Sequence, residues 1–152
     1  MICREARFQD IPRMVDLGMQ EYPKTIYARE GIKGCADVMR RAVELYMFAP
    51  NCKTWVLDKD ESIKGMLIGA IEPTYFAEAF FATDKMYVVA EDAQGHGLKM
   101  FMKFVSWAKS IPNVVAIEEI LAAGMPDQSR TAQIFERIGF KDIGSIFHME
   151  VK

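Results

Sequence analysis

The sequence has few of the residues from which metal centres and disulfide frameworks are built. Its 152 residues include only two histidines and three cysteines, and no Cys-x-x-Cys pair is present. An odd number of widely separated cysteines argues against a disulfide scaffold, and no group of His, Cys, Asp and Glu has the spacing of a metal site. We therefore expect a reduced protein that holds no metal.

Long apolar runs and clusters of one charge are also missing. No run approaches the roughly 18 apolar residues that span a bilayer, and the opening MICREARFQD carries charges where a signal peptide has an apolar core. The net charge is −2 and the basic residues are scattered, unlike the basic patches of nucleic-acid-binding proteins. The sequence thus predicts a cytoplasmic protein with neither a membrane nor a nucleic-acid partner.

The remaining composition, 51% hydrophobic, suits one globular domain over residues 1–152. The hydrophobic patterns predict the order β-α-α-β-β-β-α-β-α-β, which indicates an α/β fold with one mixed sheet flanked by helices. In chain order the expected elements are strand 2–8, helix 11–21, helix 35–48, hairpin 53–73, a strand ending at 89, helix 97–110, strand 114–121, helix 129–139, and one or two closing strands in 140–151.

The sequence also makes two specific predictions about helices in the first half of the chain. Asp10 is expected to cap the first helix, with Pro12 in its first turn. In the helix over 35–48, an apolar stripe is expected to face inward. Its members would be Val38, Met39, Ala42, Leu45 and either Met47 or Phe48.

The stretch Val88–Ser110 changes from a strand to an amphipathic helix at Gln94-Gly95-His96-Gly97. A helix that starts near Gly97 leaves its first N–H groups without carbonyl partners, and such groups bind phosphates. Gly95 and Gly97 also remove the Cβ atoms that would hold an anion away from the backbone. Neither a P-loop nor a Gly-x-Gly-x-x-Gly dinucleotide fingerprint is present. A plain strand-to-helix turn is the alternative interpretation.

Three segments in register resemble the GNAT acetyltransferase superfamily, in a form common among bacterial and bacteriophage members. The strand MYVV followed by AEDAQGHGLKMFMKF resembles its Arg/Gln-x-x-Gly-x-Gly/Ala signature. The segment SRTAQIFERIGF resembles its Asn-x-x-Ala-x-x-Leu-Tyr-x-x-x-Gly-Phe motif, and REARFQDIPRMVDLG resembles its opening strand and helix. If a phage encodes the chain, the cytoplasm in question is the host's.

The resemblance implies a binding site for acetyl-CoA as co-substrate. The strand before the turn would separate from its neighbour and offer backbone groups to the pantetheine arm. The amine would attack the thioester directly, and the N–H of Val89 would hold the oxyanion. The implied contacts are Tyr87, Val88 and Val89 with pantetheine, the backbone of Gln94, Gly95, His96, Gly97, Leu98, Lys99 and Met100 with pyrophosphate, and Gln128 or Ser129 near the pantetheine or thioester.

The chain departs from the family pattern at three positions. Lys99 stands where Gly or Ala is usual, and Glu91 where proline is common. Phe135 aligns with the tyrosine that often protonates the leaving thiolate, and phenylalanine has no proton to give. Phe135 is therefore expected to line the cofactor site without acting as an acid.

The general base remains open among carboxylates. Glu118 and Glu119 are adjacent on an expected strand, so their side chains should point to opposite faces and at most one can face the reaction. One of these two is the assignment we favour, while Asp84 and Glu72 are equally arguable.

The acceptor is expected to be an amine, either a small molecule or a protein lysine or N-terminus, and the resemblance implies that a homodimer can form. Two alternatives stay open beside the N-acetyltransferase. One is a catalytically weak or inactive CoA-binding regulator or assembly partner. The other is an interaction module in which Gln94–Lys99 is only a turn.

Overall fold

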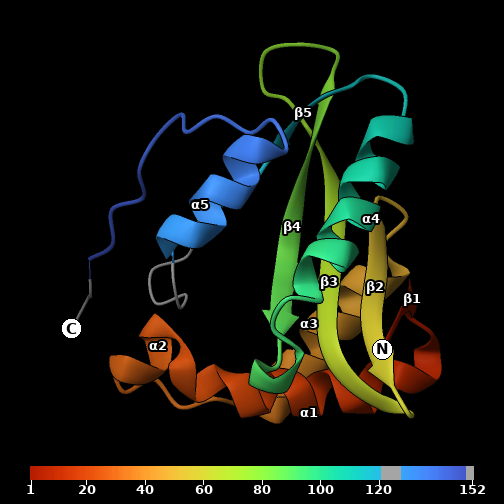
Figure 1. Ribbon diagram of the computed structural model, residues 1–152, viewed down its shortest axis with the longest axis vertical. Helices are drawn as coiled ribbons and strands as arrows, with labels where there is room; N and C mark the ends of the chain where they lie inside the picture. Colours follow the sequence, from red (N-terminus) through yellow and green to blue (C-terminus); the bar gives the residue numbers. More distant parts are fainter. Residues whose placement is uncertain (121–127, 150–152) are drawn as a thin grey trace.

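A computed structural model describes residues 1–120 and 128–149 and shows one mixed sheet with helices on both faces (Figure 1). The strand order is β1-β2-β3-β4-β5. The first four strands pair antiparallel in sequence, and β5 lies parallel to β4. The strands are β1 (Ile2–Glu5), β2 (Cys52–Lys59), β3 (Ser62–Pro73), β4 (Phe80–Val89) and β5 (Val114–Glu118).

The helices divide between the two faces of the sheet. Two of them, α1 and α3, pack on one face around Met14, Val43 and Met66, while α4 and α5 cover the other around Phe101 and Phe104. The helices are α1 (Ile11–Glu21), α2 (Ile26–Arg29), α3 (Ala36–Phe48), α4 (Gly97–Ser110) and α5 (Gln128–Arg137), with 3-10 turns η1 (Phe8–Asp10), η2 (Tyr22–Lys24) and η3 (Glu91–Ala93).

The predicted α/β class and the mixed sheet are confirmed. The hairpin between β2 and β3 turns through Asp60 and Glu61, which have φ values of 50° and 65°. Both residues therefore adopt the left-handed conformation that tight two-residue hairpin turns require. Gly139, with φ of 104°, follows the end of α5 as expected for a helix stop.

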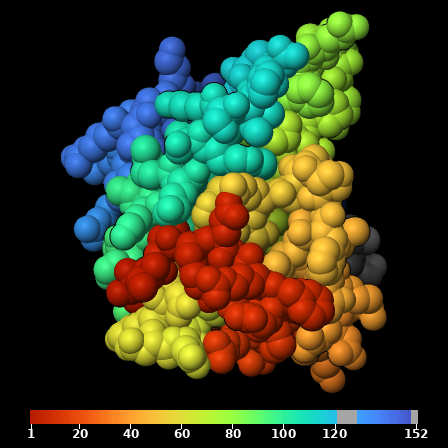
Figure 2. Space-filling view, turned by 90° about the vertical axis from the view of Figure 1, so that its right-hand side faces the viewer, coloured from red at the N-terminus to blue at the C-terminus, as the bar shows by residue number. Residues whose placement is uncertain are grey.

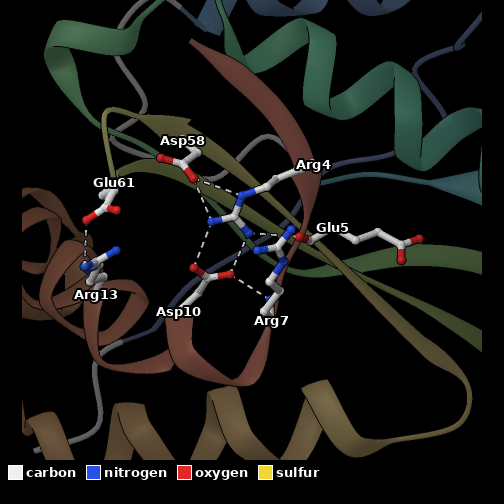
Figure 3. Close-up of polar contacts among 7 residues, drawn as sticks. All are labelled: Arg4, Glu5, Arg7, Asp10, Arg13, Asp58 and Glu61. Atoms are coloured by element: carbon white, nitrogen blue, oxygen red, sulfur yellow. Dashed lines mark hydrogen bonds and ion pairs between the residues drawn. The ribbon is translucent and has the colours of Figure 1, made fainter.

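Asp10 does not cap α1 with its side chain. Its carboxylate instead accepts a hydrogen bond from the backbone N–H of Arg7 at 2.7 Å, at the start of η1. It also accepts two hydrogen bonds from the Arg4 guanidinium, at 2.7 and 2.9 Å, and Arg4 reaches Asp58 at 2.7 Å as well (Figure 3). Asp10 is only 1% exposed. The expectation of a cap rests on sequence spacing, which gives no sign that Arg4 binds this carboxylate.

The expected inward stripe of α3 is wrong at two of its five positions, Val38 and Leu45. Val43 is fully buried, and Met39 and Met47 pack beside it against the core. Val38, Leu45 and Phe48 are instead exposed. The helix carries apolar residues on two opposite faces, and periodicity alone could not decide which of them meets the sheet.

The closing strands are not found in the described part of the tail, residues 140–149; residues 150–152 lie outside the description. Phe140 packs under α5, and the N–H of Gly144 then bonds the carboxylate of Asp142 at 3.1 Å, which forms a local turn. From there the tail runs away from the sheet toward α2, where His148 Nε2 lies 2.6 Å from Glu30 Oε1 (Figure 1). A strand pattern needs a neighbouring edge to pair with, and this path offers none.

Candidate functional site

The two parallel strands, β4 and β5, separate before β4 ends. In the described part of the chain, β5 pairs with β4 only from Phe80 to Thr83, and the last pair is Thr83 with Glu118. Among the residues that the structure describes, the rest of β4, as far as Val89, pairs with β3 alone. The strand thus has an unpaired backbone edge leading directly to the turn before α4.

The N–H of Val89 points to this unpaired edge. The next residue, Ala90, donates its N–H to the carbonyl of Lys64 at 2.8 Å, on the β3 side. Successive N–H groups of an extended strand point in opposite directions, so the Val89 N–H, and that of Tyr87 two residues earlier, point away from β3.

The amides at the start of α4 fall into two groups. The N–H groups of Gln94, His96 and Lys99 already donate to the carbonyls of Glu91, Ala93 and His96. Those of Gly95, Gly97 and Leu98 have no hydrogen-bond partner in residues 1–120 and 128–149. Of the amides from Gln94 to Met100 that the sequence suggests for pyrophosphate, three are thus already paired, and those of Gly95, Gly97 and Leu98 are free to bind an anion.

The two glycines of the turn serve different purposes. Gly95 is exposed with φ of 93°, and a Cβ there would meet nothing, so its backbone conformation requires glycine. Gly97 is buried, and a Cβ there would lie 2.6 Å from the Tyr87 hydroxyl and 3.0 Å from Val89 Cγ2. Gly97 thus allows α4 to approach β4 closely. The sequence predicts anion binding for both glycines and does not indicate this packing role.

The side chains on the turn are exposed, except for the buried Met100. Burial raises the pKa of the Cys3 thiol in β1, and the ammonium groups of Lys103 and Lys99 offset part of this increase. The Lys99 ammonium thus lies close enough to Cys3 to act on the pKa of that thiol.

Asp84 and Glu119 form a carboxyl pair where β4 and β5 separate. The two side chains lie close enough for each to shift the pKa of the other, and Glu119 Oε1 is buried without a hydrogen-bond partner in the described residues. Burial and the neighbouring Asp84 raise the pKa of Glu119 to about 9, and burial also raises the pKa of Asp84. The pair therefore retains a proton near neutral pH, because two adjacent carboxylates in a half-buried place cannot both ionise cheaply.

A β-bulge places this pair on the same face as Tyr87. Gly69 of β3 pairs with Asp84 and Ile68 pairs with Met86, so Lys85 is the extra residue. The bulge reverses the alternation, and Asp84 and Tyr87 both face α4 although they are three residues apart. Burial, Glu119 and Asp84 together raise the pKa of Tyr87, so its phenol stays protonated.

The other candidate bases are placed differently. Glu118, the last residue of β5, is exposed, whereas Glu119 is partly buried. Glu72 forms an ion pair with Lys85 at 2.7 Å. Asp84 and Glu119 directly follow Thr83 and Glu118, the last residues that pair between β4 and β5. The carboxyl pair could therefore have been predicted only if the register of these two strands were known.

Phe135 belongs to an aromatic stack. Its ring lies 4.9 Å from Phe101 and 5.2 Å from Phe140, and Phe101 also stacks on Tyr87 at 6.0 Å. These contacts attach α5 to α4. Gln128 is the first residue of α5, and Ser129 follows it on the exposed surface.

Metal-binding clusters and membrane-spanning helices are both absent from the described residues. Within 1–120 and 128–149, no group of three or more His, Cys, Asp or Glu side chains is gathered closely enough for a metal ion. None of the helices in the same two ranges has both the length and the apolar character needed to cross a bilayer.

Comparison with known proteins identifies relatives by structure and not by sequence. No protein-family model matches the chain, and no curated protein sequence does. A transcriptional regulator from Bacillus halodurans C-125 has TM-score 0.75 at 20% identity, with 99% of each chain covered. Aminoglycoside N-acetyltransferase AAC(6')-Iy, solved in complex with CoA, has TM-score 0.74 at 11% identity, with 99% of this chain and 94% of that chain covered.

A third similar structure is the aminoglycoside antibiotic 6'-N-acetyltransferase AAC(6')-IG from Acinetobacter haemolyticus, with TM-score 0.70, 12% identity, and 100% and 99% of the two chains covered. The chain thus has the fold of the N-acetyltransferases. The fold that the resemblance to the GNAT superfamily implies is confirmed.

Proposed function

We propose that the protein transfers an acetyl group from acetyl-CoA to an amine. The observation that carries the proposal is the unpaired edge of β4, which leads straight to the free amides of Gly95, Gly97 and Leu98. An extended pantetheine arm can add to the strand edge, and a pyrophosphate can accept hydrogen bonds from the amides. AAC(6')-Iy, which has a similar fold, was solved in complex with CoA, and this supports CoA as the group bound.

The proposed reaction is a direct transfer. The neutral amine attacks the thioester carbonyl, its N–C bond forms, and the negative charge moves to the carbonyl oxygen. The Val89 N–H points to the unpaired edge and would donate a hydrogen bond to that oxyanion. The C–S bond then breaks, and the CoA thiolate leaves with the electron pair and takes a proton from solvent.

An acceptor that arrives as an ammonium must lose a proton before its nitrogen can attack, and that proton would go to the Asp84–Glu119 pair. Along a strand that rises about 3.3 Å per residue, Asp84 lies roughly 13–16 Å from Val89, allowing for the bulge at Lys85. The pair therefore acts through water or on an amine that extends along β4. Because the pKa of Glu119 is raised to about 9, Glu119 already holds the proton of the pair near neutral pH, and the Asp84 carboxylate would be the group that accepts the proton of the amine.

Replacement of Leu98 by proline tests whether the free amides before α4 bind the pyrophosphate. Proline is tolerated in the first turn of a helix, so Leu98→Pro removes one free N–H while α4 is kept. We expect calorimetry to show acetyl-CoA binding at least 10-fold weaker, whereas the matched control Leu98→Ala keeps the amide and should bind like the wild type. Equal affinity of the two variants, both folded by circular dichroism, would contradict the assignment.

Turnover is measured separately, as release of free CoA thiol with a panel of diamines, aminoglycosides and lysine peptides. Phe135 favours a second candidate function, a CoA-binding protein without turnover, because the position has no proton to give. Binding of acetyl-CoA without acetyl transfer to any member of the panel would support that candidate.

A further inference from the structure

The outer face of α3 is apolar and uncovered. Val38, Leu45 and Phe48 are 53%, 65% and 66% exposed, while Val43 on the opposite face is fully buried. Phe8 extends this surface, because its ring lies 6.0 Å from that of Phe48 and is 70% exposed. We call these four residues the outer stripe. Figure 2 shows the N-terminal segment (red) and the α3 region (orange) side by side, with no green or blue segment drawn over them.

The spacing within the outer stripe is that of a helix–helix seam. Positions 38, 41, 45 and 48 follow one another at intervals of 3, 4 and 3, which is the spacing of paired helices. Arg41 is the only polar member of the series. A surface helix with one apolar face normally buries it against its own domain, and α3 already does so through Met39 and Val43. The second apolar face is therefore available to another chain.

We propose that the outer stripe binds a second copy of this protein, with the two α3 helices antiparallel about a two-fold axis. In such a pair Val38 meets Phe48 of the second copy, and Arg41 meets the second copy's Leu45. Each contact then occurs twice, as a two-fold interface requires.

The charges beside the stripe complement one another in this arrangement. The antiparallel register that pairs positions 38 and 48 brings Arg41 next to Glu44 of the second copy. Neither Arg41 nor Glu44 forms an ion pair with any residue that the structure describes. Two equivalent Arg41–Glu44 pairs would therefore form across the axis without breaking a contact within either copy. This complementarity favours a second copy over an unrelated partner.

The experiment is sedimentation equilibrium of the full chain from 1 to 100 μM. We expect a dimer in the wild type and a dissociation constant at least 10-fold higher for Leu45→Glu, which places a charge in the seam. Arg40→Glu is the matched control, because Arg40 is also exposed on α3 but lies outside the stripe. It should leave the dissociation constant within about 2-fold of the wild type.

Exchange of the charges tests the register. Arg41→Glu and Glu44→Arg should each raise the dissociation constant about 10-fold, and the double variant should recover most of the loss. A wild type that is monomeric at 100 μM would overturn the proposal, and so would a dimer that Leu45→Glu leaves unchanged, because the second copy would then dock elsewhere. Unchanged circular dichroism and thermal midpoints establish that each variant is folded.

Discussion

The close approach of α4 to β4 makes Gly97→Ala a sharp test of the turn. The new Cβ would lie 2.6 Å from the Tyr87 hydroxyl oxygen and 3.0 Å from Val89 Cγ2. The Tyr87 ring stacks on Phe101 and cannot swing aside freely. Overpacking of this kind costs about 1–3 kcal/mol, and the better helix propensity of alanine offsets up to about 1 kcal/mol. We expect a net loss of about 1–2 kcal/mol, which for a chain of this size lowers Tm by about 2–8 °C.

Removal of the hydroxyl should relieve the clash. In Tyr87→Phe the nearest ring atom to the new Cβ is Cζ at 3.5 Å, an ordinary contact. Thermal unfolding of wild type, both single variants and the double variant forms a double-mutant cycle. We expect Gly97→Ala to cost less than half as much in the Tyr87→Phe background as in the wild type. An equal cost in both backgrounds, or a stabilised Gly97→Ala single variant, would refute the reasoning.

Three further predictions concern the carboxyl groups of Asp10 and Glu119 and the absence of a proton donor at Phe135. Asp10→Asn should lower the free energy of unfolding by about 2–3 kcal/mol, because it leaves the Arg4 guanidinium partly unpaired. The pKa of Asp10 is lowered from 3.8, so in urea titrations this contribution should be present above pH 3.8 and disappear as the pH falls further, whereas the variant shows no such loss. For Glu119 the sign is opposite: its folded pKa of about 9 exceeds 4.5, so wild-type stability should fall between pH 4.5 and 9, and Glu119→Gln should flatten that slope. Phe135→Tyr should raise kcat for acetyl transfer several-fold if protonation of the thiolate limits the rate, and an unchanged kcat measured by thiol release would show that it does not.

Much of the architecture could be predicted because local signals and tertiary structure agree. The hairpin around Asp60 and Glu61 and the glycine stop at Gly139 follow from residue types alone. The strand, turn and helix around Gln94–Gly97 were predicted in the right order. At α3 the agreement fails, because the outer stripe and the buried face both have helical periodicity, and the choice between them depends on the shape of the sheet.

The site was less predictable for a similar reason. The carboxyl pair of Asp84 and Glu119 depends on the register between β4 and β5, and no local pattern encodes which residues of two distant strands become neighbours. The role of Gly97 depends on Tyr87, ten residues earlier in the chain, whose hydroxyl occupies the space that a Cβ would need. Both features arise from packing between elements.

The extra residue at Lys85 makes the length of β4 as important as its composition. Before Lys85, pairing with both β3 and β5 determines which face of the sheet a side chain of β4 points to. After Lys85, pairing with β3 alone determines it. A one-residue insertion or deletion between Phe80 and Lys85 would turn Asp84 to the opposite side of the sheet while Tyr87 and Val89 kept their places. Substitutions in either half of β4 are therefore compatible with this arrangement, whereas insertions and deletions between the two halves are not.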